Sequence, residues 1–486
     1  MTNVFAGCLA SPESAEIFGD AAIVQAMLDF QASLARAKAA AGLIPAAAAS
    51  TIARSCKADI FDIAQLVRAG QHAGSLAIPL VGALRDNVAL FDADAARNVH
   101  KGSTSQDVID TALVLVTRRA LDLIEADLDR QVAAAARLAR AHAATPMLAR
   151  TLMQPAIITT FGWKCAGWVQ ALQHCRERLA LSRPAALRLQ LGGAAGTLEL
   201  FGEHADAISQ FMARDLGLAP SGPWHTQRET WIGLACDLGL VAGTIGKIAR
   251  DLALLSQGEV GELAEPHAAG RGGSSAMPHK RNPVAALIGI AAALRVPQRV
   301  AALMAAMPQE NERGLGNWQA ELAEWPDLVI AVHGSTSAMA TALEGLQVFA
   351  ERMRANIEAT HGLVFAEAAS ALLSNALPPG VGAALVQELC GEIGAAAHKA
   401  PQLQDLLLKA IARRTALRGK VSAAQVRAVF AVEPKAARLA LRTRSVLDAV
   451  VGEATAKQPA KSSPSNQPKR AASAARKPVR RREGVS

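Results

Sequence analysis

The stretch STSQDVIDTALVLVTRRALDLIEADLDRQVAAAARLARAHAAT, residues 103–145, contains neither glycine nor proline over its whole length. Such a run predicts one long helix, because glycine and proline are the residues that most weaken or end helices. Its later part spaces apolar residues by three and four positions, which forms one apolar face along a helix. These residues are Leu121, Ile124, Leu128, Val132, Ala135 and Leu138.

Two further runs extend this pattern through the middle of the chain. Residues 231–257 repeat the three-and-four spacing, and another apolar run starts after Pro283. Four glycines in the first of these runs would each weaken an isolated helix by ~1 kcal/mol relative to alanine, so we expect a closely packed neighbour. They are Gly233, Gly239, Gly243 and Gly246. No segment alternates with period two, and the sequence therefore predicts an all-α protein with a bundle of long central helices.

The composition fits a globular chain divided into three helical parts. Of 486 residues, 51% are hydrophobic and 19% charged, which excludes a wholly disordered protein. Aromatic residues are only 3%, with no tyrosine, so alanine, leucine, valine and isoleucine must fill the core. We expect an N-terminal helical part at 1–110, a long-helix bundle at 111–353 and a C-terminal helical part at 354–451.

Cysteine spacing and apolar run length predict a soluble, cytoplasmic protein. The six cysteines show no CxxC or CxxH spacing, which argues against a disulfide framework and a cysteine metal site. The first basic residue is Arg36, so the chain shows no secretory signal pattern. The longest apolar run, 284–294, is much shorter than the ~20 residues that span a bilayer.

The C-terminal residues 452–486 differ from the rest in composition. Most of the net charge of +9 lies here, among lysine, arginine, alanine, serine and proline, with hardly any large apolar residue. Such a segment cannot bury a core, and we expect a solvated, disordered tail. Nonspecific attraction to nucleic acid through this tail is the functional alternative.

The segment GRGGSSAMPHKRNP, residues 270–283, interrupts the helical pattern. Its glycines and prolines predict a loop, and long loops inside a helical body are usually functional. Ser274 and Ser275 offer hydroxyl groups, whereas Lys280, Arg281 and Asn282 offer cations and an amide for binding an anion.

This loop resembles the signature of the fumarase and aspartase superfamily, whose usual form is GSSxMPxKxN. Two other segments agree with that superfamily: HKGSTSQDVIDT at 100–111 and RLQLGGAAGT at 188–197. The resemblance implies a three-part helical fold, a homotetramer, and active sites that combine segments from three subunits. It implies no metal and no cofactor, with a small polycarboxylate as the substrate.

Within the superfamily, several segments are similar to the 3-carboxy-cis,cis-muconate cycloisomerases of protocatechuate breakdown. They are LDFQASLARAKAAAGLIP at 28–45, TSQD at 104–107, PWHTQR at 223–228 and ERGLGNWQAE at 312–321. The resemblance implies interconversion of 3-carboxy-cis,cis-muconate and 4-carboxymuconolactone. The alternative is adenylosuccinate lyase or a related fumarate-releasing lyase. The intact loop argues against a non-enzymatic scaffold.

The resemblance also assigns roles to individual residues. It implies that Ser274, with Ser275 beside it, exchanges the proton at carbon. Arg313 is a candidate ligand of a substrate carboxylate, and a structural ion pair is its alternative role. The full set of expected substrate-binding residues is His100, Thr104, Ser105, Gln106, Gln154, Lys280, Asn282 and Arg313.

One segment departs from the superfamily pattern. Related enzymes commonly place a catalytic histidine in RTHxQxA or RTxxQHA, but residues 150–156 read RTLMQPA, with Leu152 and Pro155 at the two histidine positions. Either the second proton-transfer group is dispensable, because a lactonising carboxylate is already ionised, or His100 or His225 replaces it. For each of these two histidines, a structural hydrogen-bonding role is the alternative.

Overall fold

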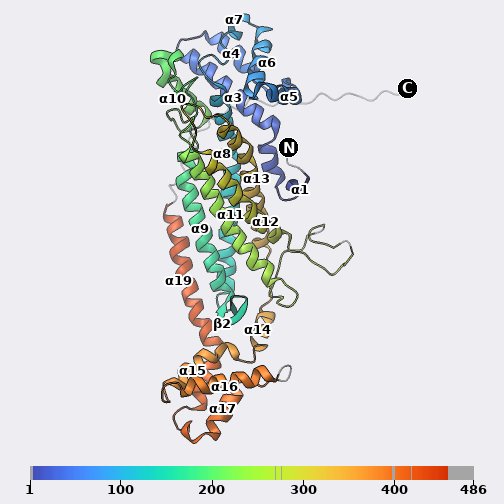
Figure 1. The fold of residues 1–486 in the computed structure, drawn as a ribbon, viewed down its shortest axis with the longest axis vertical. Helices are drawn as coiled ribbons and strands as arrows, with labels where there is room; N and C mark the ends of the chain where they lie inside the picture. Colours follow the sequence, from blue (N-terminus) through green and yellow to red (C-terminus); the bar gives the residue numbers. More distant parts are fainter. Residues whose placement is uncertain (1–3, 269, 275, 397–399, 418, 458–486) are drawn as a thin grey trace, which may run out of the picture.

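The computed structural model describes residues 4–268, 270–274, 276–396, 400–417 and 419–457. The molecule is elongated, with the N-terminal part at one end, a bundle of long helices in the middle and a small C-terminal part at the other end (Figure 1). The N-terminal part consists of α1 (Val4–Gly7), α2 (Pro12–Ile17), α3 (Asp20–Ala40), α4 (Ala46–Ser55), η1 (Ala58–Ile60), α5 (Ile63–Ala73), α6 (Ala77–Ala89) and α7 (Ala93–Ala96).

Five long helices form the central bundle: α8 (Ser105–Ala141), α9 (Phe161–Ala186), α11 (Glu229–Leu255), α12 (Val284–Ala306) and α13 (Asn317–Glu344). Around the bundle, α9 packs between α8 and α11, α12 packs between α11 and α13, and α13 closes the ring against α8. With 37 residues, α8 is about 55 Å long at 1.5 Å per residue. The bundle therefore has two ends separated by more than the width of a small domain.

The predicted apolar face of α8 is confirmed. All six residues that define it are buried in the main core. The helix starts at Ser105, so the expected boundary between residues 110 and 111 falls inside α8. Thr104 has an extended backbone and is the N-cap, which ends the N-terminal part before residue 105.

The close packing expected from the glycines of α11 is found against α12. A Cβ atom at Gly246 would lie 2.2 Å from Cβ of Ala293, and one at Gly239 would lie 3.1 Å from Cγ2 of Val300. Gly233 and Gly243 have no such neighbour within 4 Å. Two of the four glycines, Gly239 and Gly246, therefore have the expected closely packed neighbour within the chain.

Short strands are added to the helical fold. β1 (Pro146–Thr151) and β2 (Gln154–Thr160) form an antiparallel hairpin that joins α8 to α9, and β3 (Leu263–Ala264) pairs with β4 (Gln347–Val348). Leu152 and Met153 make the two-residue hairpin turn with φ of 49° and 68°. Turns of this type match the twist of a hairpin but favour asparagine and glycine, so this sequence carried no turn signal.

The C-terminal part has its own small core. It contains η3 (Leu363–Phe365), α15 (Ala366–Ser374), α16 (Val381–Ala395), α17 (Leu403–Arg413), η5 (Thr415–Leu417) and α18 (Ala423–Phe430), and it follows α14 (Ala350–Glu358). The last helix, α19 (Glu433–Lys457), returns along α9 (Figure 1). The expected start of the tail at residue 452 therefore lies within a helix. Residues 458–486, and with them the predictions for the tail, lie outside the described residues.

Two helices, α11 and α12, are long and apolar enough to cross a membrane by length and composition alone. Core helices of soluble proteins meet the same criterion. The most apolar window of α11 is 61% buried inside the protomer, whereas that of α12 is 28% buried. The exposed face of α12 carries Leu287, Leu294 and Met304, each at least half exposed.

Candidate active site

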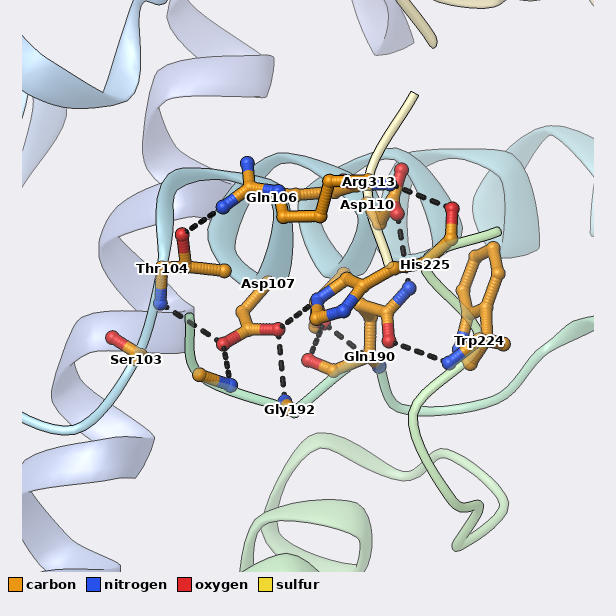
Figure 2. A network of polar contacts seen from close by, with 12 residues as sticks. Ser103, Thr104, Gln106, Asp107, Asp110, Gln190, Gly192, Trp224, His225 and Arg313 are labelled. Carbon is orange, nitrogen blue, oxygen red and sulfur yellow. Dashed lines mark hydrogen bonds and ion pairs between the residues drawn. The ribbon is translucent and has the colours of Figure 1, made fainter. Parts of the chain in front are cut away.

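The N-terminus of α8 is the centre of the best-formed polar site (Figure 2). Thr104 and Ser105 are partly exposed there, and the Arg313 guanidinium donates a hydrogen bond to Oγ1 of Thr104. A helix N-terminus presents unpaired N–H groups and positive potential, which favours the binding of anions. Thr104 and Arg313, both expected from sequence to bind substrate, are thus brought together from positions 209 residues apart.

A tight turn before α8 shapes this site. His100 and Gly102 have φ of 65° and 95°, and a Cβ at Gly102 would lie 2.2 Å from the Phe201 ring, so only glycine fits. Nδ1 of His100 lies 2.9 Å from Oγ of Ser103 and 3.0 Å from Nε2 of Gln31. Burial, with nearby cationic side chains, lowers the pKa of His100 to about 4. His100 is therefore neutral near pH 7.

Asp107 lies directly beneath the turn and is fully buried. Its carboxylate accepts hydrogen bonds from the backbone N–H groups of Thr104, Gly192 and Gly193, each at 2.9 Å, and Nε2 of His225 lies 2.8 Å away. A Cβ at Gly192 would lie 2.6 Å from Cε1 of His225, so this approach requires glycine. The RLQLGGAAGT segment recognised from sequence is thereby joined to the TSQD segment.

A second buried ionic cluster lies one turn further along α8. Nη1 of Arg228 donates to Oδ2 of Asp110 at 2.8 Å, and its Nε donates to Oε2 of Glu321 at 3.1 Å. All three side chains are fully buried or nearly so. Burial opposes the charge of Arg228, but the two carboxylates together outweigh it and raise the pKa of the guanidinium. This cluster joins α8, the start of α11 and α13.

Uncharged groups complete the second cluster. Nε1 of Trp318 donates to Asp110 at 2.9 Å, and Nε2 of Gln190 donates to the same carboxylate at 3.1 Å. The Trp224 ring lies 4.4 Å from the Arg228 guanidinium. Trp318, in the ERGLGNWQAE segment, is therefore a buried hydrogen-bonding residue.

Gln106, expected to bind substrate, is buried beneath the N-terminus of α8. It is 1% exposed, and its Nε2 donates to the carbonyl of His225 at 2.9 Å. One of its two amide hydrogens is therefore used inside the protein, and its contact with substrate stays a prediction.

The signature loop lies at the other end of α12 from Arg313. Oγ of Ser274 accepts hydrogen bonds from the backbone N–H groups of Met277 and Ala276, at 3.1 and 3.4 Å. Lys280 and Asn282 are exposed, as is His279. Ser275 lies outside the described residues. The predicted interruption between two helices is confirmed, and the roles of these residues stay predictions.

The hairpin with Gln154 is exposed at its tip. Arg150, which pairs with Pro155 one step before the turn, forms a bidentate ion pair with the fully buried Glu262, at 2.7 and 3.0 Å. Because the hairpin follows the C-terminus of α8, it lies about 55 Å from Thr104 of the same chain. His100 and His225, which the sequence offered as substitutes for a hairpin histidine, lie at the Thr104 end.

One protomer thus holds two separate groups of expected site residues. His100, Thr104, Ser105, Gln106 and Arg313 gather at one end of the bundle, whereas Gln154, Ser274, Lys280 and Asn282 lie toward the other. Sequence reasoning missed Asp107, Asp110, Arg228 and Glu321 as a buried polar network. The signal available was two acids three residues apart at the start of an apolar helix. Within the described residues, no group of three or more histidine, cysteine or acidic side chains could hold a metal ion.

Comparison with known proteins fits this geometry. A family model described as Lyase matches residues 9–297. The chain is 49% identical over 383 residues to the 3-carboxy-cis,cis-muconate cycloisomerase of Pseudomonas aeruginosa, covering 79% of this chain and 83% of that protein. It is 43% identical over 397 residues to the nitrosuccinate lyase of Streptomyces davaonensis, covering 80% and 83%.

A solved structure gives the same result for the fold. The 3-carboxy-cis,cis-muconate lactonizing enzyme of Pseudomonas putida superposes with a TM-score of 0.83 and 40% identity, covering 92% of this chain and 99% of that one. The chain therefore belongs to the lyase family, the fumarase and aspartase superfamily. Its all-α, three-part fold is the fold of that superfamily.

Proposed function

We propose that this protein is a cycloisomerase that interconverts 3-carboxy-cis,cis-muconate and 4-carboxymuconolactone. The observation that carries the proposal is the convergence of Arg313 on Thr104 at the N-terminus of α8, a place suited to a substrate carboxylate. The 49% identity to a cycloisomerase supports the choice of substrate. Such an enzyme would act in protocatechuate breakdown, and we propose a cytoplasmic location.

The reaction needs few groups from the protein. One carboxylate oxygen of the substrate forms a C–O bond to an alkene carbon, and the π electron pair moves to the neighbouring carbon, which takes up a proton. In the transition state, negative charge spreads onto the carboxylate attached to that neighbouring carbon. Fixed donors at that carboxylate would lower the barrier most. We propose Thr104, Ser105 and Arg313 as these donors, and Ser274 as the group that exchanges the proton.

We further propose that each site is shared between subunits of a homotetramer. The length of α8 prevents Thr104 and Gln154 of one chain from meeting in one site. Exposed apolar groups are available for contact with other subunits: Leu287, Leu294 and Met304 on α12, and Leu152 at the hairpin tip, which is 96% exposed. Burial of such groups would stabilise the assembly.

The test is the loss of the conjugated-diene ultraviolet absorbance of 3-carboxy-cis,cis-muconate, measured with and without a chelator. We expect turnover in both conditions. Thr104→Val should reduce it at least 10-fold, whereas Thr341→Val, on the exposed side of α13, should stay within twofold of the parent. Cleavage of nitrosuccinate or adenylosuccinate, with the muconate untouched, would instead assign a fumarate-releasing or related lyase activity.

A further inference from the structure

We propose that Asp107 is a positioning residue that sets the geometry of the carboxylate-binding end of the site by holding three chain segments on one buried carboxylate. The segments are the N-cap of α8, the glycine pair at 192–193 and His225. The inference rests on the proposed function only for the identity of the substrate.

The hydrogen bonds around Asp107 use all of its accepting capacity. Oδ2 accepts from the N–H groups of Thr104 and Gly193, and Oδ1 accepts from the N–H of Gly192 and faces Nε2 of His225. An ionised carboxylate offers about four lone-pair positions, and all four are occupied here. Because the side chain is fully buried and has no position left, Asp107 does not contact substrate.

On this proposal, Asp107 fixes residues of two kinds. Some are expected to contact the substrate, and others hold a residue that is expected to contact it. Asp107 holds Thr104 directly, because the backbone N–H of Thr104 donates to its carboxylate, and Oγ1 of Thr104 in turn accepts a hydrogen bond from Arg313. His225 holds Gln106 through its carbonyl. A shift of the Asp107 contacts would therefore move Thr104, Arg313 and Gln106 relative to one another. Misplaced donors lose much of their effect, because catalysis depends on preorganised geometry.

Asp107→Asn is the decisive variant. The amide has one accepting oxygen, and its NH₂ group would face two groups that donate hydrogen bonds in the parent. We expect KM for 3-carboxy-cis,cis-muconate to rise at least 10-fold and kcat/KM to fall at least 100-fold. Binding without turnover is measured as the thermal stabilisation given by propane-1,2,3-tricarboxylate, which the variant should lose.

Asp127→Asn is the matched control. Asp127 is another buried carboxylate on α8, 20 residues further along and so about 30 Å away, and it accepts hydrogen bonds from Arg130 and Thr336. This control should lose thermal stability while its KM stays within threefold of the parent. Equal losses of substrate affinity in both variants would overturn the proposal, because the effect would then be one of general stability.

His225 supplies the rescue test. His225→Gln keeps an N–H donor for Asp107 and should retain at least a tenth of the parent kcat/KM, whereas His225→Leu should resemble Asp107→Asn. If both His225 variants bind the tricarboxylate normally yet are equally inactive, His225 acts in the chemistry and the positioning proposal is overturned.

The same measurements separate the positioning role of Asp107 from the identity of the substrate. Suppose that the parent protein does not consume the muconate, but the tricarboxylate stabilises the parent and does not stabilise Asp107→Asn. The proposed substrate is then wrong, and the positioning role of Asp107 stands. A crystal structure of the D107N protein gives a readout that needs no ligand. Displacement of Gly192 and Gly193 from α8 is expected, and unchanged positions would contradict the proposal.

Discussion

Replacing Arg228 with methionine tests the energetic role of the buried ionic cluster. Methionine keeps most of the length of the side chain but removes the cation between Asp110 and Glu321, both of which are buried. Breaking a buried ion pair on one side typically costs about 3–5 kcal/mol, because a charge is left uncompensated. That cost corresponds to a roughly 150- to 5,000-fold smaller ratio of folded to unfolded protein.

Urea unfolding at fixed protein concentration, followed by tryptophan fluorescence, measures this cost. The triple variant R228M/D110N/E321Q separates charge from packing, since it removes both carboxylates together with the cation. We expect it to recover at least half of the stability lost in R228M. A loss below about 1 kcal/mol in R228M would refute the reasoning, since it lies under the range for a broken buried pair. A triple variant no better than the single one would assign the loss to packing.

The pH dependence of R228M has a defined sign. Burial already raises the pKa of Glu321 in the parent, against the opposing effect of Arg228. Without the cation, the carboxyl of Glu321 should bind a proton in the folded protein above pH 4.5, where the unfolded chain has released it. Folding stability then falls as pH rises through this window. The deficit of R228M should therefore be smaller at pH 5 than at pH 7, and an equal deficit at both values would contradict the explanation.

Three further measurements follow from the described geometry. Ser274→Ala should lower turnover by about 10²- to 10⁴-fold without changing the far-ultraviolet circular dichroism, and activity within threefold of the parent would remove Ser274 from the proton-transfer role. Ser274→Ala and Thr104→Val proteins that are denatured, mixed and refolded together should be more active than either alone, because some shared sites would then contain neither substitution. Mixed tetramers, confirmed by mass, whose activity never exceeds the average of the two would refute shared sites. Burial lowers the pKa of His100 to about 4 in the folded state, so folding stability should fall as pH drops from 6.5 to 4, because only the unfolded chain gains the proton. His100→Gln should flatten that part of the curve of stability against pH. An unchanged slope, measured by urea unfolding at several pH values, would contradict this.

The long helices could be predicted because their signal is local. The apolar spacing of residues 121–138 and the lack of glycine and proline between 103 and 145 depend only on neighbours in sequence. The β1–β2 hairpin could not be predicted in this way. Its strands have six and seven residues, and Leu152 and Met153 occupy turn positions that usually signal their presence through glycine or asparagine.

Thr104 and Arg313 were assigned to substrate binding through the resemblance of their segments to a known family, and the structure brings the two side chains into contact. The role of Asp107 was hidden, because its partners Gly192 and His225 are 85 and 118 residues away and only the packed fold brings them together. The same holds for Arg228, whose partner Glu321 lies 93 residues further along on a different helix. A buried carboxylate and an exposed one look alike in a sequence without its fold.

The 37-residue length of α8 limits how the bundle can change over evolution. Removing seven residues from α8 would nearly preserve its apolar face, since seven residues make almost two turns, but it would shorten the helix by about 10 Å. On the shared-site proposal, the hairpin of one subunit would then no longer reach the Thr104 end of another unless the other long helices shortened with it. The composition of the core, largely alanine and leucine, would not by itself prevent such a deletion. On that proposal, the distance between the two groups of site residues in one chain constrains the length of α8, and we expect related enzymes to vary in their loops and C-terminal parts far more than in the span of this helix.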